Sequence, residues 1–138
     1  MRASLTPGGP TIATVLVVED DPDVALLLRL ALDRAGHAVW VEGDGECGLA
    51  AATRLKPDVV LTDWMLPHRS GVELCQAIRR DPALSDTAVI LVTARDRECD
   101  REWAYAAGVD CYVAKPFVTA QLVSSVETAL HRRLAPES

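Results

Sequence analysis

The residue best placed to do chemistry is Asp63, which ends the segment PDVVLTD at residues 57–63. A carboxylate beside a buried apolar strand costs free energy unless the site uses its charge. A second acidic cluster, Glu19-Asp20-Asp21, ends an earlier apolar run at residues 15–18. If the two strands are parallel neighbours, these like charges are crowded together, and a cation bound by carboxylate oxygens relieves their repulsion. The two segments together predict a cation site.

Two more polar residues follow apolar segments. Thr93 comes directly after residues 89–92, and Lys115 lies two residues after Val113. Ligands of parallel α/β sheets bind outside the carboxyl ends of the strands, so we expect these groups on one rim with the acids. The set suits phosphoryl transfer: the acids hold Mg²⁺, Asp63 attacks phosphorus in line, and Thr93 and Lys115 bond the phosphoryl oxygens.

The elements that position these residues alternate five times between strand and helix, which is typical of a parallel sheet covered on both faces. We expect strands at 12–18, about 38–42, the segment ending at Asp63, 88–92 and 110–113. We expect helices from Asp21-Pro22 to Gly36, from about 45 to before Pro57, and at 71–80, 96–107 and about 119–133. In the first helix, apolar residues spaced by three and four predict the buried face: Val24, Leu27, Leu28, Ala31 and Ala35.

Composition limits the class of protein. The 138 residues are enough for one domain with a sizeable core, and 49% hydrophobic with 25% charged residues indicates a globular chain. A formal net charge of −6 argues against a nucleic-acid-binding surface on this domain. The absence from the sequence of a membrane-length apolar run or a signal-peptide core predicts a cytoplasmic protein without membrane contact.

The cysteines do not indicate a metal site or a disulfide framework, because they lie far apart and form no C-x-x-C pair. We interpret all four as small buried or half-buried thiols: Cys47, Cys75, Cys99 and Cys111.

Four motifs, in this order and at suitable spacing, resemble the receiver domain of two-component response regulators. They are VVEDDP (17–22), VLTDWMLP (60–67), LVTAR (91–95) and GVDCYVAKPF (108–117). The resemblance covers residues 12–133 and leaves 1–11 as a flexible leader and 134–138 as a tail. It implies an α/β fold with a five-stranded parallel doubly wound sheet, in the flavodoxin-like order 2-1-3-4-5 with helices on both faces.

The resemblance also implies a function and a set of roles. A sensor histidine kinase or phosphotransfer protein would donate a phosphoryl group from histidine to Asp63 in a Mg-dependent reaction. Thr93 and Tyr112 would be the switch pair, and Lys115 the phosphate-binding lysine, followed by a cis bond to Pro116. The domain would catalyse only its own phosphoryl transfer and dephosphorylation. Four groups would surround the metal: the side chains of Glu19, Asp20 and Asp63 and the backbone carbonyl of Met65.

The surface switched by phosphorylation would be that of the fourth helix, fifth strand and fifth helix, which is also a possible homodimer face. The wording TDWMLP resembles receivers of winged-helix transcription factors, whose dimers use ion pairs on this face. Here Trp103 stands where a charged residue is expected, and Cys111 where an acid is usual, so this chain departs from that ion-pair pattern. We expect Trp103 either exposed next to this face, as an anchor for a partner, or partly buried against Tyr105 and nearby alanines.

Several assignments have alternatives. Asp21 is interpreted as the cap of the first helix and Asp20 as the metal ligand. Tyr112 could be a core aromatic residue, and His68, in an unusual loop, either a partner contact or a solvated side chain. The sequence does not identify the downstream effector, and the receiver either stands alone or forms part of a larger regulator.

Two other classes of protein are disfavoured. A phosphatase of the haloacid-dehalogenase type has a second Asp two residues after its nucleophile, where this chain has Met65. A flavodoxin-like electron carrier has a hydroxyl- and glycine-rich phosphate loop after the first strand, where this chain has the acids 19–21.

Overall fold

The computed structural model describes residues 12–134. A single sheet of five parallel strands has the order β2-β1-β3-β4-β5, which confirms the expected fold class. The strands are β1 (Thr14–Val18), β2 (Ala38–Glu42), β3 (Val59–Thr62), β4 (Ala88–Thr93) and β5 (Cys111–Ala114). The expected leader at 1–11 and most of the tail at 134–138 lie outside the described residues. No helix in the described range is long and apolar enough to cross a membrane.

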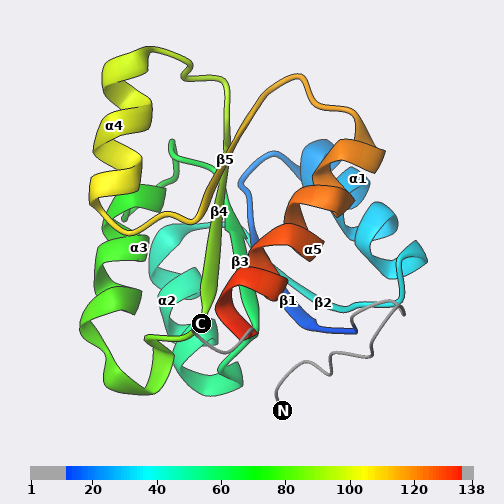
Figure 1. Cartoon of the computed structure of the whole chain (residues 1–138), viewed down its shortest axis with the longest axis horizontal. Coiled ribbons are helices and arrows are strands. Elements are labelled where there is room, and N and C mark those ends of the chain that lie inside the picture. Colours follow the sequence, from blue (N-terminus) through cyan, green and yellow to red (C-terminus); the bar gives the residue numbers. More distant parts are fainter. Residues whose placement is uncertain (1–11, 135–138) are drawn as a thin grey trace.

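Five α-helices cover the two faces of the sheet: α1 (Pro22–Arg34), α2 (Gly45–Leu55), α3 (Gly71–Arg80), α4 (Glu98–Ala106) and α5 (Thr119–Leu134). Helices α1 and α5 lie on one face, and α2, α3 and α4 on the other (Figure 1). A 3₁₀ turn at Pro82–Leu84, which the sequence analysis did not predict, precedes β4. Helix α4 begins at Glu98 and not at 96, and β5 begins one residue later than expected, which are differences at element ends.

The core explains why the central strands are almost uniformly aliphatic. Leu16, Val60 and Leu91 pack under α2, α3 and α4. Alternate residues such as Val17 and Ile90 pack under α1 and α5. Because both faces are covered, successive side chains of a strand are buried in turn, and β3 and β4 have no exposed position.

The expected buried face of α1 was partly wrong. The buried residues are Ala25, Leu28 and Leu32, whereas Leu27 is 46% exposed. This helix has apolar residues on most of its sides, so spacing alone does not select the side that meets the sheet. The structure leaves three leucines of α1 exposed: Leu26, Leu27 and Leu30.

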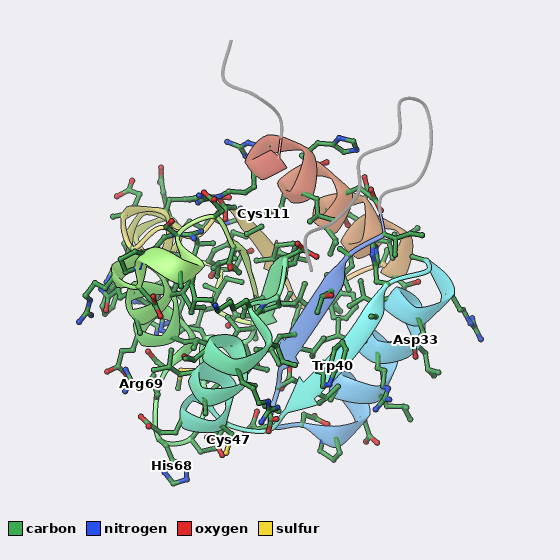
Figure 2. All side chains as sticks on the ribbon, turned by 90° about the horizontal axis from the view of Figure 1, so that it is seen from below. Asp33, Trp40, Cys47, His68, Arg69 and Cys111 are labelled. Carbon is green, nitrogen blue, oxygen red and sulfur yellow. The ribbon has the colours of Figure 1, made fainter. Side chains whose placement is uncertain are left out.

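The expectation for the cysteines was also partly wrong. Cys47 and Cys99 are exposed, Cys111 is half-buried, and only Cys75 is buried. Cys47 lies on the outer surface of α2 (Figure 2). Burial raises the pKa of the Cys75 thiol to about 11, so this side chain is an inert core group.

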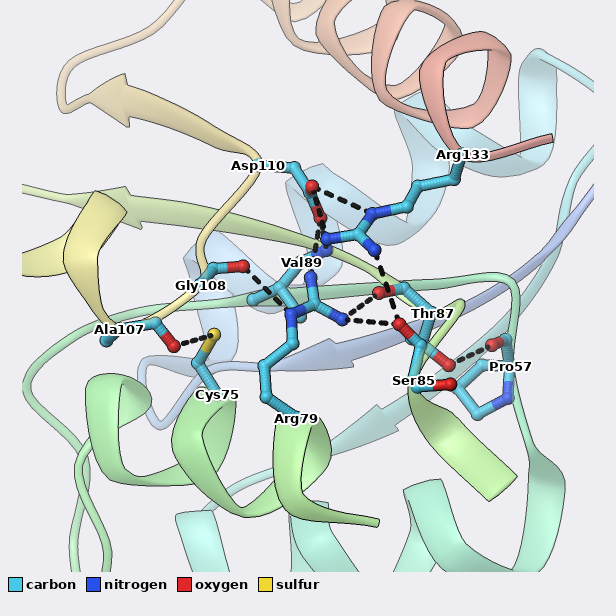
Figure 3. Close-up of polar contacts among 10 residues, drawn as sticks. All are labelled: Pro57, Cys75, Arg79, Ser85, Thr87, Val89, Ala107, Gly108, Asp110 and Arg133. Atoms are coloured by element: carbon cyan, nitrogen blue, oxygen red, sulfur yellow. Dashed lines mark hydrogen bonds and ion pairs between the residues drawn. The ribbon is translucent and has the colours of Figure 1, made fainter. Parts of the chain in front are cut away.

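A cluster of two arginines and one aspartate joins α3 and α5 at the edge of the sheet where β4 and β5 begin (Figure 3). Asp110, just before β5, accepts a bond of 2.7 Å from Arg79 of α3 and one of 2.8 Å from Arg133 in the last turn of α5. Both arginines also donate to the carbonyl of Ser85 at 3.3 Å. The cluster therefore fixes the end of α5 and the start of β5 to the same point of the domain.

A buried histidine lies between the start of the sheet and α5, and its Nε2 has no hydrogen-bond partner among the described residues. The His37 Nδ1 accepts a bond of 3.0 Å from the Ala13 backbone N–H, so the proton of the neutral ring is on Nε2. That nitrogen lies 3.4 Å from a carboxylate oxygen of Glu127. Burial lowers the pKa of His37, although Glu127 partly opposes the shift.

This arrangement predicts a loss of stability in mild acid. Because the folded-state pKa of His37 is below its unfolded value of 6.5, its contribution is complete above that pH and is lost as the pH falls through the folded-state pKa. Between pH 7.5 and 5, we expect the free energy of unfolding to fall more steeply in the wild type than in His37→Gln. The difference between the two slopes should be at most about 1.4 kcal/mol per pH unit, the limit for one proton. Urea unfolding at several pH values measures both proteins, and parallel pH profiles would contradict the prediction.

Candidate phosphoryl-transfer site

The site is at the carboxyl ends of β1 and β3, where the hydrogen bonds of the sheet continue one residue past each strand. The Asp63 N–H donates to the Val18 carbonyl at 3.1 Å, and the Glu19 N–H donates to the Glu42 carbonyl at 3.0 Å. These bonds fix the backbone of both acids. Carboxylate oxygens of Glu19, Asp20 and Asp63 consequently lie within 4.8 Å of one another.

Lys115 supplies the positive charge of the site. Its Nζ donates to Asp63 Oδ2 and to Glu19 Oε1, each at 2.7 Å. Burial alone would lower the pKa of Lys115, but the two carboxylates raise it above its ordinary value, so the side chain is an ammonium ion. Burial raises the pKa of Glu19 despite the opposing bond from Lys115. The bond from Lys115 therefore does not fully offset the cost of burying the charge of Glu19.

The other oxygen of Asp63 is held by the chain that follows it. Asp63 Oδ1 accepts bonds from the backbone N–H groups of Trp64 at 2.6 Å and Met65 at 3.3 Å. The carboxylate is thus fixed at both oxygens, and its side chain is only 11% exposed. A nucleophile at a strand end needs such a fixed carboxylate. The backbone N–H groups hold Oδ1 in position, and Oδ2, which is bonded to Lys115, can face an incoming group.

Gly71 makes the close packing behind Asp63 possible. Its N–H donates to the Trp64 carbonyl at 2.9 Å at the start of α3. A Cβ atom at this position would lie 2.0 Å from the Asp63 carbonyl oxygen. Only glycine leaves the backbone of the phosphoacceptor candidate where it is.

The two expected switch residues lie next to the site on β4 and β5. Thr93 is buried at the end of β4, and its Oγ1 accepts a bond of 3.3 Å from the Arg95 N–H. Its carbonyl accepts a bond of 2.9 Å from the Lys115 N–H. The Tyr112 ring is largely buried, and its hydroxyl donates to the Arg95 carbonyl. Both hydroxyls are therefore linked to one residue, Arg95, which the sequence analysis did not single out.

The exposure of Trp103 agrees with one of the two expectations, but its position on α4 does not. It is 55% exposed, as one alternative held, and its ring packs edge-to-face with the ring of Trp64, with the two centroids 5.4 Å apart. On the same helix, Arg101 lies over the Tyr112 ring at 4.9 Å. Two residues are 200° apart on a helix, so Trp103 is on the flank of α4 opposite Arg101 and away from β5.

The remaining candidates are placed as follows. Asp21 caps α1 by accepting from the Asp23 N–H at 2.9 Å, as predicted, which leaves the exposed Asp20 in the acidic cluster. Met65 is 62% exposed beside the site. His68 has a left-handed backbone with φ 70° and its ring points outward from the surface (Figure 2). The Lys115-Pro116 peptide is cis.

The donor set fits a hard divalent cation. Three carboxylates within 4.8 Å, one of them exposed, offer the oxygen ligands that Mg²⁺ prefers and leave one side open to water and phosphate. The raised pKa of Glu19 reflects the burial that an added positive charge would offset.

A model of the response regulator receiver domain matches residues 15–127. The phosphate regulon transcriptional regulatory protein PhoB of Rhizobium meliloti is 41% identical over 125 residues, which are 89% of this chain and 54% of that protein. The DNA-binding response regulator MtrA of Mycolicibacterium smegmatis is 38% identical over 118 residues, 86% of this chain and 50% of that protein. The chain spans about half the length of these curated relatives.

Solved structures agree. A putative response regulator from Chloroflexus aurantiacus has a TM-score of 0.83 at 33% identity, covering 87% of this chain and 98% of that one. The receiver domain of sensor histidine kinase PA1611 from Pseudomonas aeruginosa, with a magnesium ion coordinated in its active site cleft, has a TM-score of 0.77 at 30% identity. It covers 90% of this chain and 98% of that one.

The glycine behind Asp63 gives a direct test of how the site is built. Gly71→Ala should lower the free energy of unfolding by about 1–3 kcal/mol, because the new methyl group displaces the Asp63 backbone. Gly43→Ala is the matched control, since a Cβ atom there meets nothing within 4 Å, and it should change stability by less than about 0.5 kcal/mol. Urea unfolding measures both variants, and equal losses would contradict the prediction.

Proposed function

Because the chain belongs to the receiver-domain family of two-component response regulators, we propose that Asp63 accepts a phosphoryl group from a phosphohistidine of a sensor kinase or phosphotransfer protein. The observation that carries this proposal is the carboxylate of Asp63, fixed at both oxygens and bonded to Lys115, beside two further acids. Neither the phosphatase nor the electron-carrier alternative has support in the comparisons.

In the proposed reaction an Asp63 oxygen attacks phosphorus in line, the bond from phosphorus to the histidine nitrogen breaks, and an acyl phosphate forms. Glu19, Asp20 and Asp63, with the Met65 carbonyl, would hold Mg²⁺, which neutralises charge on the phosphoryl oxygens. Lys115 exchanges its bond with Asp63 for one with a phosphoryl oxygen. Hydrolysis of the acyl phosphate returns Asp63 to its free carboxylate. In this proposal the domain catalyses only the phosphoryl transfer to itself and its own dephosphorylation.

The switch follows from the new oxygens. Thr93 would donate its hydroxyl to the phosphoryl group, which draws the β4–α4 loop inward, and the Tyr112 ring would turn into the vacated space. The output surface would be α4, β5 and α5, where Arg101 covers Tyr112.

The histidine donor has a suitable docking surface next to the acids. Exposed Leu26 lies in a groove that also contains Glu19 and Asp20. A separate groove lies between Leu27 and Leu30 of α1 and Val123 of α5. An apolar helix surface beside the phosphoacceptor rim fits a helical partner that presents its histidine to Asp63.

The downstream effector is proposed from the relatives. MtrA is named as DNA-binding and is about twice as long as the matched segment. We infer that this receiver controls a DNA-binding partner or segment, in the cytoplasm, without contacting DNA through its own acidic surface. The proposal includes a homodimer through α4, β5 and α5.

Phosphorylation of Asp63 is tested with a small donor. Incubation with Mg²⁺ and acetyl phosphate should add one phosphoryl group to the wild type and none to Asp63→Asn, because only Asp63 combines the metal acids with Lys115. Asp23→Asn, which removes an exposed acid of α1, should react as the wild type does. Intact-protein mass spectrometry measures the addition, and phosphorylation that survives Asp63→Asn would rule out the assignment.

Metal binding is tested through stability. Millimolar Mg²⁺ should raise the free energy of unfolding of the wild type by about 1–3 kcal/mol, because a ligand of the folded state alone stabilises it. Asp20→Asn should lose most of this increase. Asp21→Asn is the control, because asparagine caps a helix as well as aspartate does and Asp21 is outside the acidic cluster. A Mg²⁺ effect that is the same in all three proteins would contradict the proposed site.

A further inference from the structure

Four side chains beside the phosphoacceptor form a cluster that joins the loop after β4 to the rest of the domain. The Arg95 guanidinium lies 4.2 Å from the centre of the Trp64 ring and donates to Asp100 at 2.8 Å. The side chain of Asp100 is only 8% exposed. The ring of Trp103, on α4, packs edge-to-face with the ring of Trp64. Arg95 is thus held by charge from one side and by an aromatic face from the other.

The backbone of Arg95 is hydrogen-bonded to both switch hydroxyls. The Arg95 N–H donates to Thr93 Oγ1, and the Arg95 carbonyl accepts from the Tyr112 hydroxyl. Among the described residues, the bonds to the Asp63 carboxylate come from Trp64, Met65 and Lys115, and not from Thr93. The loop position fixed by Arg95 is therefore one in which Thr93 is not bonded to the phosphoacceptor.

We propose that Arg95 is a latch: its side chain, held by Asp100 and Trp64, keeps the β4–α4 loop in the phosphate-free position, and phosphorylation has to release it. The inference rests on the proposed phosphorylation of Asp63 and adds a positioning residue to it. Movement of Thr93 toward Asp63 carries Arg95 with it, because only Ala94 separates them, and the stacking on Trp64 and the bond to Asp100 are broken or rebuilt.

The latch has a definite energetic consequence. Contacts that are made in only one of two conformations stabilise that conformation. A ligand that binds the other conformation then has a lower apparent affinity. A partly exposed cation stacked on tryptophan and paired with a buried carboxylate should lower the apparent affinity for a phosphoryl group roughly two- to tenfold. The charge of the buried Asp100 gives the latch its specificity, since a neutral partner would not retain the guanidinium equally well.

Beryllofluoride, which mimics the phosphoryl group on aspartate, tests this directly in the presence of Mg²⁺. Arg95→Ala and Asp100→Asn should each lower the half-saturating beryllofluoride concentration roughly two- to tenfold, measured by thermal shift. Arg97→Ala is the matched control, because this exposed arginine of the same loop caps α4 without a side-chain bond. It should leave the half-saturating concentration unchanged. The double variant should match Arg95→Ala, because Arg95→Ala already removes the bond that Asp100→Asn weakens.

A second measurement separates the latch from a general loss of structure. Without ligand, hydrogen exchange of the 94–97 backbone should be faster in Arg95→Ala than in the wild type, while exchange in β1 and β3 stays the same. Unchanged exchange, a half-saturating concentration equal to that of Arg97→Ala, or a higher one would overturn the latch. Failure of the proposed function looks different: the wild type itself would then show no response that Asp63→Asn abolishes.

Discussion

The structure depends on one electrostatic constraint, the meeting of three carboxylates and one ammonium ion at the end of a buried sheet. Lys115 bonds Glu19 and Asp63 at 2.7 Å, and Asp20 adds a further negative charge beside them. Such a cluster is costly in a small domain because the acids repel one another and have lost part of their water. The fold tolerates this cost because the sheet fixes the ends of β1, β3 and β5, which carry these charged residues. The same cost makes the site responsive, since any added cation or phosphoryl group changes the charge balance.

The surrounding residues serve this constraint in different ways. Backbone amides after β3 hold one oxygen of Asp63, and Gly71 allows α3 to begin directly behind it. Far from the site, the pairing of Asp110 with Arg79 and Arg133 fixes where β5 begins, and therefore where Lys115 lies four residues after Cys111. Asp110, at the amino end of β5, thus contributes to the geometry of the site at the carboxyl ends of the strands.

Much of this arrangement could be predicted from the sequence, because polar residues at strand ends and helix caps are local signals. The convergence of Glu19, Asp20, Asp63 and Lys115 follows from the strand order, and the Asp21 cap from the Asp-Pro pair. The buried side of α1 and the exposure of Cys47 and Cys99 could not be predicted, because they depend on which helix side meets the sheet. The partner of Trp103 and the role of Arg95 depend on contacts between β3, β4 and α4 that no spacing in the sequence encodes.

The distribution of the three tryptophans has a consequence for spectroscopy. Trp64 and Trp103 touch beside the phosphoacceptor, and Arg95 covers one of them. Trp40 is on the edge strand, in register with Val60 through Leu16, so it is two strands, roughly 10 Å, to the side. Trp64 comes after the end of β3 at Thr62, so it is at least two further residues, about 7 Å, along the strand direction. The intrinsic fluorescence of the protein consequently combines a site-sensitive emission with a nearly constant one, and replacing Trp40 by phenylalanine would isolate the first.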